Sequence, residues 1–336
     1  MSNPKVCICI PCYNNSKTIA DTLVSIFAQD YPNIVIKIFD NASTDDTVSI
    51  IRSFTEAKYP VELHVRKENS GAEVNFNSCI AHSDGEFSAI FHADDIYASD
   101  IISKQVDFLN RHPQSNAVST HARFIDSTGS ILKKRKMLPR SLNKNLEMEL
   151  SKSELIEILY KYGNIITCPS VLFRTNTLKF KIEKFRHGQF RSSSDLDVWF
   201  RLLETGNFGF INKPLINYRL SNSSFSYNLS KIRTEDSDMF LVLDYYLKVY
   251  ATAAPDKHYR KLLGYKNFLL MRDRAVTNFN RLVTEVTPYK KINLHKNIYL
   301  ALASTFHLKS FFLSATIKLL VIMPFGRNAV KLLRRA

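Results

Sequence analysis

The stretch EFSAIFHADD, residues 86–95, decides the fold of this chain. Residues 87–91 form a short apolar run of the kind that becomes a buried strand. Two adjacent carboxylates, Asp94 and Asp95, follow the run, and His92 stands just before them. Because ligands bind outside the carboxyl ends of the strands in an open α/β sheet, we expect these side chains at the mouth of a site.

The two adjacent carboxylates admit two interpretations. Like charges repel, and a bound hard cation such as Mg²⁺ or Mn²⁺ is one way to keep both groups ionised. Such a cation can also bridge to phosphates. The alternative is that Asp94 and Asp95 only cap the following segment and face water. The stretch alone leaves both open, so the rest of the chain has to decide.

Strands and helices alternate through the first hundred residues. The expected strands are residues 5–10, 34–39, 61–65 and 87–91, and the expected helices are residues 17–29, a segment ending at Phe54, and residues 71–82. Pro11 is expected to stop the first strand. Near-continuous apolar strands suit a parallel sheet covered on both faces. The pattern predicts a doubly wound α/β, Rossmann-like, nucleotide-binding half.

Composition indicates a folded protein with an uneven charge. The chain has 336 residues, 45% of them hydrophobic, and a net charge of +15. Residues 227–336 hold 19 Lys and Arg against 7 Asp and Glu, so +12 of the total lies there. A basic tail behind a near-neutral front suggests contact with anions. Of the five cysteines, Cys7, Cys9 and Cys12 are expected to be small buried hydrophobes rather than metal ligands, and free thiols without an export signal predict the cytosol.

Several motifs in register resemble family 2 glycosyltransferases of the GT-A fold, of the kind that build bacterial cell-surface polysaccharides. They are residues 6–14, 25–32, 40–46, 69–71 with Asn77, and 85–95. The resemblance covers residues 4–225. It implies a GT-A glycosyltransferase domain over residues 1–225, followed by a basic helical C-terminal region over residues 226–336.

The resemblance implies a nucleotide site at the ends of the first two strands. Pro11, Tyr13 and Asn14 lie just past the first strand, where a ring and polar groups can hold a nucleobase. Asp40 can accept a hydrogen bond from a base imide or a ribose hydroxyl. Relatives often carry a second acid after it, where this chain has Asn41, and an amide both donates and accepts. The identity of the base therefore stays open.

The segment after the third strand is expected beside the ribose and the phosphates. The resemblance implies donor binding by Asn69, Gly71 and Asn77. Relatives commonly carry a basic residue just before the position of Asn77, where this chain has Phe76. A side-chain cation for the diphosphate is then expected elsewhere, such as Arg66 or the lysine after it, without a firm assignment.

At the central motif the family usually shows Asp-X-Asp-Asp, and this chain has His92-Ala93-Asp94-Asp95. The resemblance implies that Asp94 and Asp95 hold the Mg²⁺ or Mn²⁺ and the donor ribose, in an order left open. His92 replaces the first carboxylate. As a neutral imidazole it can coordinate the metal, and as a core residue it would not; both interpretations stand.

A helix expected over residues 192–203 is the second chemical landmark. Acidic side chains at a helix start are stabilised by its dipole, which is a sufficient structural reason for Asp195 and Asp197. The family, however, places its catalytic base at the position of Asp195. We therefore expect Asp195 to be catalytic and Asp197 to be structural. Arg219, at the end of a strand expected over residues 215–220, would meet phosphate or close the site.

Further elements are expected in the second half. They are helices over residues 99–111, 150–162, 239–250 and 259–282, a hairpin of residues 117–125 with 131–132, a basic solvated loop at residues 133–136, and a strand over residues 168–174. Residues 310–325 contain one charge, Lys318, and a basic cluster follows at residues 327–335. This tail either packs on the protein or anchors it on an anionic cytoplasmic leaflet.

These observations predict a metal-dependent, inverting glycosyltransferase with a nucleoside-diphosphate-sugar donor and a saccharide acceptor, lipid-linked if the tail lies on a membrane. A nucleotidyltransferase would usually show a Gly-rich basic loop after the first strand, which residues 11–15 lack. A nucleic-acid-binding protein would explain the charge but not the acidic motifs at the strand ends, so no nucleic-acid partner is expected. The donor sugar, the acceptor, the linkage and the oligomeric state are not specified by the sequence.

Overall fold

The computed structural model describes residues 3–55, 61–132, 145–220, 233–251 and 257–284, with residues 312, 315–316 and 319–320. Two compact units are present. The first comprises Met1–Ile156 and Asn164–Ser221, and the second comprises Glu157–Gly163 and Asn222–Ala336. The basic loop expected at residues 133–136 and the basic cluster at residues 327–335 lie outside the described residues, as does most of the apolar stretch 310–325.

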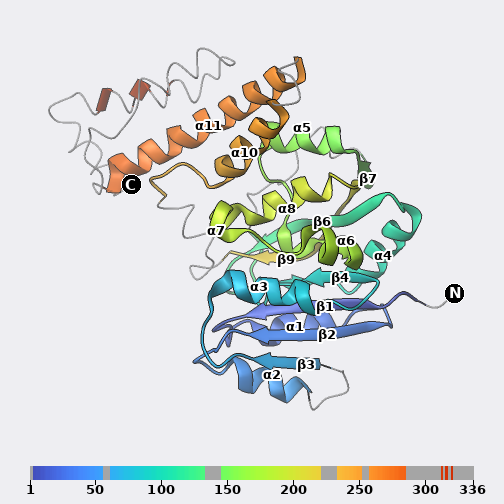
Figure 1. Cartoon of the computed structure of the whole chain (residues 1–336). Coiled ribbons are helices and arrows are strands. Elements are labelled where there is room, and N and C mark those ends of the chain that lie inside the picture. Colours follow the sequence, from blue (N-terminus) through green and yellow to red (C-terminus); the bar gives the residue numbers. More distant parts are fainter. Residues whose placement is uncertain are drawn as a thin grey trace. The chain divides into compact units, whose positions relative to one another are not determined.

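The first half of unit 1 is a parallel sheet with helical crossovers (Figure 1). Its elements are β1 (Val6–Cys12), α1 (Ile19–Phe27), β2 (Ile34–Asp40), α2 (Thr47–Thr55), β3 (Val61–Val65), α3 (Gly71–His82) and β4 (Phe87–Ile90). β1 pairs in parallel with β2 and β4, and β2 pairs in parallel with β3. Parallel neighbours need a crossover connection, which the three helices supply. The expected α/β architecture is confirmed.

The first strand is longer than expected, because Pro11 does not stop it. Cys9 accepts a backbone hydrogen bond from Phe91, so odd positions of β1 face β4, and the pairing with β4 ends at Cys9. Pro11 faces the same side two residues further along β1. No strand pairs with β1 on that side at this point, so the missing N–H of Pro11 costs no ladder hydrogen bond. On the other side the pairing with β2 continues to Cys12, which lies opposite Asp40.

The second half of unit 1 turns the sheet into a mixed one. It adds β5 (Ile96–Tyr97), β6 (Ser115–Ile125), β7 (Glu147–Leu150), β8 (Leu172–Arg174) and β9 (Asn207–Arg219), in the spatial order β3-β2-β1-β4-β8-β6-β9-β5 with β7 also on β9. β8 is antiparallel to β4 and β6, whereas β9 runs parallel to β6. β5 pairs with the end of β9, which brings Arg219 back to the segment after β4.

Three expected strand features differ in the structure. The strand expected at residues 215–220 is the end of the 13-residue β9. The hairpin expected with residues 131–132 is reduced to a single bridge between Ile125 and Ile131, because β6 pairs with β8 and β9 instead. The strand expected at residues 168–174 begins with a 3₁₀ turn, Cys168–Ser170, in which Pro169 can donate no ladder hydrogen bond.

The second half of the chain's first 202 residues also contains helices and helical turns, of which α5 is shared between the two units. They are α4 (Ile101–Arg111), α5 (Lys152–Tyr162), α6 (Thr175–Thr177), a π-helical turn Leu178–Ile182, α7 (His187–Phe190), a 3₁₀ turn Arg191–Ser193 and α8 (Ser194–Leu202). Trp199 of α8 is fully buried and contacts Phe173 of β8 and Phe208 of β9, with ring centroids 6.1 and 5.8 Å away. These ring contacts of Trp199 hold α8 in place on the sheet.

Unit 2 contains two further helices, α10 (Met239–Ala251) and α11 (Lys257–Thr284), close to their expected bounds. Arg233 pairs with Asp273, and Arg274 with Asp236, so basic side chains of this unit are partly used in internal ion pairs. Among the described residues, no helix has the length and apolar character that crossing a membrane requires.

Candidate active site

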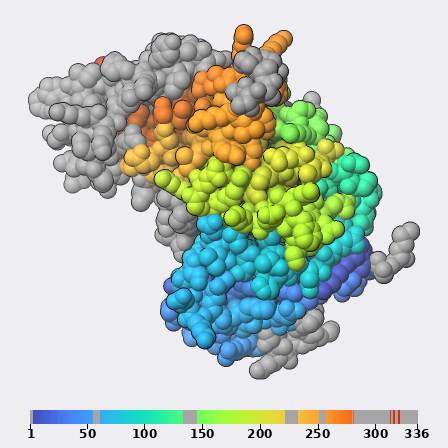
Figure 2. Space-filling model, in the orientation of Figure 1, coloured from blue at the N-terminus to red at the C-terminus, as the bar shows by residue number. Residues whose placement is uncertain are grey.

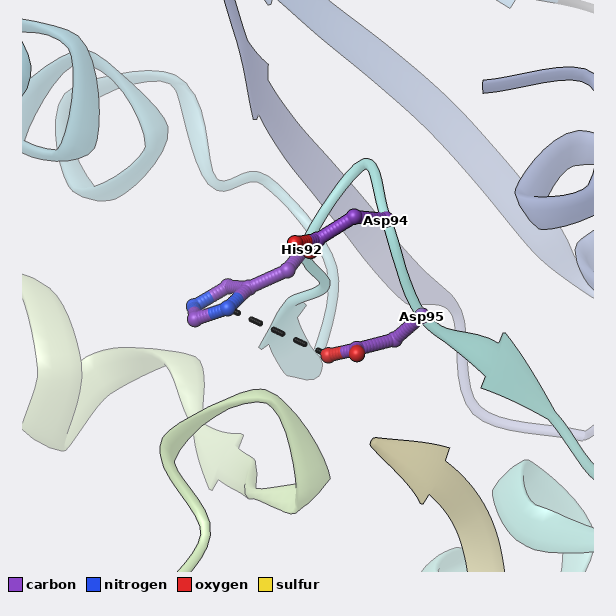
Figure 3. Close-up of side chains that lie close together, drawn as sticks. All are labelled: His92, Asp94 and Asp95. Atoms are coloured by element: carbon purple, nitrogen blue, oxygen red, sulfur yellow. Dashed lines mark ion pairs between the residues drawn. The ribbon is translucent and has the colours of Figure 1, made fainter. Parts of the chain in front are cut away.

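The segment between β4 and β5 brings His92, Asp94 and Asp95 together. Each side chain offers one ligand atom, and these atoms all lie within 4.8 Å of one another. His92 and Asp95 point to the same side of the loop, with Nδ1 of His92 3.9 Å from Oδ2 of Asp95 (Figure 3). The structure thus assembles the three residues that the sequence proposed as a metal site.

Burial dominates the electrostatics of this cluster. Asp95 is fully buried, and burial raises its pKa well above the usual range, followed by the charge of Asp94; Arg219 acts in the opposite direction. Burial also raises the pKa of Asp94. For His92, burial lowers the pKa to about 4, so the imidazole is neutral at pH 7 and carries a free lone pair.

The donor set fits a divalent cation. Oδ2 of Asp95 is buried and has no hydrogen-bond partner among the described residues. Orphaned buried polar atoms are costly, so they call for an explanation. The 3.9 Å between Nδ1 and Oδ2 is too long for a hydrogen bond, whereas two bonds of about 2.1 Å to one cation span up to about 4.2 Å.

Arg219 locks this loop from the end of β9. Its backbone N–H donates to Oδ1 of Asp95 and its Nε donates to the carbonyl of Asp94, both at 2.8 Å. The same guanidinium donates to the carbonyl of Ser127 and lies 3.4 Å from Asp21 of α1. Only 3% of Arg219 is exposed, and its role in the structure is to fix the acidic loop.

Aromatic side chains pack on both sides of His92. Phe76 of α3 meets the imidazole edge-to-face with ring centroids 5.5 Å apart. On the other side the backbone N–H of His92 donates to the hydroxyl of Tyr97, 2.8 Å away, and Tyr97 stacks on Phe91. Phe76 thus occupies, next to the acidic loop, the position where relatives were expected to be basic. The guanidinium of Arg66, one candidate for that charge, donates to the hydroxyl of Ser78 on α3.

The ends of β1 and β2 form a connected polar turn. Asp40 is fully buried, and its carboxylate accepts hydrogen bonds from the N–H and hydroxyl of Ser43. Asn14 has a left-handed backbone, φ 53°, and its side-chain oxygen accepts from the N–H of Thr44. Pro11 is buried at the end of β1, whereas Tyr13 is 43% exposed. Tyr13 and Asn14 are thus the exposed residues of this group, and the ring of Tyr13 is open to a ligand.

Asn41 ties this turn to the start of α3. Its amide donates to Oδ1 of Asn69 at 2.8 Å and to the carbonyl of Gly71 at 3.2 Å, and it accepts from the N–H of Ser70. Asn41, Asn69 and Gly71, which the sequence placed around the nucleotide, are therefore in contact. Gly71 has φ +84°, a conformation that L side chains rarely adopt.

Asn77 connects α3 with the segment before α8. It accepts from the N–H of Phe185 at 2.8 Å and donates to the carbonyl of the same residue. One turn earlier, Glu73 accepts from the N–H of Gly188. Figure 2 shows the green-yellow segment that carries these residues directly against the blue part of unit 1. No local signal in the sequence predicts these contacts, which join residues more than 100 positions apart.

Asp195 lies in the first turn of α8, as expected. Burial raises its pKa to about 6, against the hydrogen bonds from the N–H of Leu196 and the amide of Asn164, which favour the ionised form. Nδ2 of Asn164 donates to Oδ2 of Asp195 at 2.8 Å. The sequence did not single out Asn164, which stands 31 positions away. A carboxyl group with a pKa near neutrality is suited to proton transfer.

Asp197, two residues further along α8, is in a different setting. It is fully buried and forms ion pairs with Arg186 and Arg201, the latter at 2.9 Å. This geometry gives Asp197 the structural role that the sequence assigned to it.

Two side chains link the acidic loop with Asp195. After burial, the charges of Asp195 and Asp95 raise the pKa of the Cys168 thiol. Burial and then the charges of Asp95, Asp94 and, more weakly, Asp195 raise the pKa of Tyr218. The charges of the acidic loop and of Asp195 thus act on the same two side chains. The sequence did not single out Tyr218 or Cys168 as residues that respond to both.

Residues 7–179 match the family model described as Glycosyl transferase family 2, which is 173 of the chain's 336 residues. Two curated relatives are similar over most of their length. The putative teichuronic acid biosynthesis glycosyltransferase TuaG of Bacillus subtilis is 27% identical over 67% of this chain and 82% of its own. The UDP-Glc:alpha-D-GlcNAc-diphosphoundecaprenol beta-1,3-glucosyltransferase WfgD of Escherichia coli is 25% identical over 80% of this chain and 99% of its own.

Solved structures share the fold. TarS of S. aureus, residues 1–349 in complex with UDP-GlcNAc, matches with a TM-score of 0.63 at 17% identity, over 98% of this chain and 92% of that one. The mannosyltransferase PcManGT of Pyrobaculum calidifontis, in complex with GDP-Man and Mn²⁺, matches with a TM-score of 0.54 at 19% identity, over 98% of this chain and 84% of that one.

Proposed function

The chain belongs to glycosyl transferase family 2, and from this premise we propose that it is a metal-dependent, inverting glycosyltransferase of cell-surface polysaccharide synthesis. The observation that carries the proposal is the cluster of His92, Asp94 and Asp95 just after β4, whose ligand atoms lie within 4.8 Å of one another. The names of TuaG and WfgD support the polysaccharide context, and the UDP-GlcNAc complex of TarS supports a uridine-diphosphate-sugar donor.

The donor nucleotide is proposed to lie across the ends of β1, β2 and β4. Pro11, Tyr13 and Asn14 would contact the base, with the exposed ring of Tyr13 as the stacking surface. Asp40 and Asn41 would complete the base and ribose contacts from the end of β2. The support for this arrangement is that their side chains form one connected turn at the carboxyl edge of the parallel sheet.

The diphosphate is proposed to run from this turn to the acidic loop. Asn69, Gly71 and Asn77 line the path, because Asn41 holds the first two and α3 carries the third. Arg219 contributes indirectly, because its guanidinium holds the backbone carbonyl of Asp94.

His92, Asp94 and Asp95 would hold Mg²⁺ or Mn²⁺, with Asp94 also near the ribose. When bound, such a cation supplies positive charge that stabilises the departing diphosphate. A neutral imidazole is a better ligand for transition metals than for Mg²⁺, so the donor set favours Mn²⁺ over Mg²⁺. Tyr97 supports the ligand set by accepting the backbone N–H of His92.

Asp195 is proposed to act as the general base. Its carboxylate takes the proton of an acceptor hydroxyl while that oxygen attacks the anomeric carbon of the donor sugar. The bond from that carbon to the β-phosphate oxygen breaks, and the nucleoside diphosphate leaves with the electron pair. A single displacement of this kind inverts the anomeric configuration. Asn164 holds the carboxylate in one orientation by donating to Oδ2.

Calorimetric titration with UDP, in the presence of Mn²⁺ and in the presence of EDTA, tests this proposal. We expect binding with Mn²⁺ and its loss with EDTA, because the unpartnered acidic loop otherwise repels the phosphates. Turnover of UDP-sugars on a saccharide acceptor, followed by NMR assignment of the new anomeric centre, tests inversion. Equal affinity in both titrations would contradict the metal site, and retention of configuration would contradict the role of Asp195.

A lipid-linked acceptor and attachment to an anionic membrane surface are the second part of the proposal. The diphosphoundecaprenol acceptor in the name of WfgD supports the first, and the net charge of +12 over residues 227–336 supports the second. Each Lys or Arg near an anionic leaflet contributes about 1 kcal/mol, so several give reversible binding at the cytoplasmic face. No nucleic-acid partner is proposed.

Vesicle flotation separates membrane binding from other anion binding. The full-length protein should float with phosphatidylglycerol vesicles at low salt, less at high salt, and not with phosphatidylcholine vesicles. Removal of residues 310–336 should abolish flotation and leave UDP binding intact. Failure to float at low salt, or equal retention on duplex DNA, would contradict a membrane as the partner of this charge.

A further inference from the structure

One face of α1 carries a row of polar side chains toward the acidic loop. Thr18, Thr22, Ser25 and Gln29 are spaced four, three and four residues apart, from the N-cap of the helix to just past its C-cap. This spacing places them on one side of the helix. We call Thr18, Thr22, Ser25 and Gln29 the α1 polar row.

Each member of the α1 polar row makes a hydrogen bond with the backbone of residues 93–98. Thr18 donates to the carbonyl of Ala93 at 3.0 Å, Thr22 to that of Asp95 at 2.8 Å, and Gln29 to that of Ala98 at 2.9 Å; Ser25 accepts from the N–H of Tyr97 at 3.1 Å. The helix thus holds four successive points of the loop that presents Asp94 and Asp95.

The opposite side of the loop is held as well. Arg219 takes the carbonyl of Asp94, and the N–H of Ala98 donates to the carbonyl of Leu215. Between them, α1 and β9 hold the backbone at each residue from Ala93 to Ala98. A backbone held in this way restricts how far the side chains of Asp94 and Asp95 can move away from each other.

Packing alone does not explain the α1 polar row. The apolar side of α1 is supplied by Ile19, Leu23 and Ile26, all buried in the main core. Thr22 is also fully buried, and burying a hydroxyl is unfavourable unless it is hydrogen-bonded. A helix that only had to pack would carry an apolar residue there, so the buried hydroxyl indicates a positional role.

We propose that the α1 polar row positions the loop of His92, Asp94 and Asp95 for a divalent cation. Without a cation, the two adjacent carboxylates repel each other, and the imidazole beside them remains desolvated. A loop whose backbone was not hydrogen-bonded would relieve these costs by moving the three side chains apart. The hydrogen bonds of Thr22 and its neighbours hold the ligand atoms together before the cation arrives. Binding then requires less ordering of the protein, which raises affinity. This inference rests on the proposed metal site.

Thr22→Val tests the proposal, because it removes the hydroxyl and keeps the shape of the side chain. Loss of an outer partner of a metal site typically reduces metal affinity by about 10–100-fold. We expect the Mn²⁺ dissociation constant, measured by the EPR signal of free Mn²⁺ with UDP present, to rise by about tenfold or more. Thr22→Ser restores the hydroxyl and should bind Mn²⁺ within about twofold of the parent protein, a range below 0.5 kcal/mol.

Thr175→Val is the matched control. Thr175 of α6 is also buried, and its hydroxyl pairs with that of Ser88 on β4 at 2.7 Å, a bond that involves no residue of the acidic loop. Both Val variants should lose comparable thermal stability, but only Thr22→Val should lose Mn²⁺ affinity. Equal Mn²⁺ affinity in Thr22→Val and the parent protein, or equal loss in both Val variants, would overturn the inference. No Mn²⁺ binding by the parent protein would instead overturn the metal site itself.

Discussion

Asp95 and Asp195 are two desolvated carboxylates of the proposed active site, and the protein holds them in opposite ways. Asp95 is fully buried beside Asp94, on a backbone tied at nearly every residue. Asp195 is only half-buried, at the start of a helix, and the N–H of Leu196 and the amide of Asn164 orient it. Burial raises the pKa of both, far above the usual range for Asp95 and to about 6 for Asp195.

These different settings suit the two carboxylates to different partners. Two adjacent buried carboxylates ionise together only when an opposite charge comes close, so the loop of Asp94 and Asp95 is suited to a cation. A single carboxylate with a pKa of about 6 exchanges a proton near neutral pH without help, so Asp195 is suited to a proton. Three changes test this contrast.

Asp95→Asn should have the largest effect. It removes the unpartnered anionic oxygen of the loop, so we expect the Mn²⁺-dependent binding of UDP and the turnover to fall below detection. Stability should not fall, because the substitution replaces a buried carboxyl with a neutral amide of the same shape. Calorimetry gives the first quantity and thermal unfolding the second. Full UDP affinity in this variant would show that the loop does not act through a cation.

Asp195→Asn should leave UDP binding unchanged and reduce kcat by about 10²–10⁴-fold, the usual contribution of a general base. The structure offers a control on the same helix. Asp197→Asn breaks the ion pairs with Arg186 and Arg201, which should cost about 2–3 kcal/mol of stability; both arginines keep some access to water, so the loss is below that of a fully buried pair.

The two variants should therefore separate chemistry from stability. The melting temperature should fall in Asp197→Asn and stay unchanged in Asp195→Asn. The kcat of the folded protein should fall in Asp195→Asn and stay unchanged in Asp197→Asn. If UDP affinity collapsed in Asp195→Asn, that residue would belong to the donor side, and the contrast with Asp95 would be lost.

Asn164→Ala should have the smallest effect and change mainly the pH dependence. The base must be ionised, so turnover of the parent protein should rise as pH increases through about 6. Asn164 donates to the ionised carboxylate and thereby lowers its pKa. Loss of a hydrogen bond to a charged group, about 1.5 kcal/mol, raises the pKa by about one unit. Turnover should then fall about fivefold at pH 6 and little at pH 8.

Asn33→Ala provides the comparison for this substitution. It removes an exposed amide hydrogen bond to the carbonyl of Asn3, far along the chain from Asp195, and should leave the pH profile unchanged. A uniform loss of turnover at every pH in Asn164→Ala would mean that Asn164 only supports the local fold.

Much of the first half was predictable from sequence. Apolar runs and amphipathic segments are local patterns, and they located β1–β4 and α1–α3 within a few residues. The second half was less predictable. β9 turned out to be 13 residues long, and residues 168–170 form a turn rather than a strand. Antiparallel and parallel partners that are far apart in sequence decide those elements, and no local pattern records such partners.

By itself, the sequence determined the chemistry at the strand ends: His92, Asp94 and Asp95 after β4, Asp40 after β2, and an acid at the start of α8. These follow from position within local elements, because strand ends of one parallel sheet share an edge. The hydrogen bonds that orient the groups were decided only in the tertiary structure. Thr22 reaches Asp95 across 73 positions, and Arg219 reaches it across 124. Such bonds depend on how helices and strands pack, and packing is a property of the whole fold rather than of any segment.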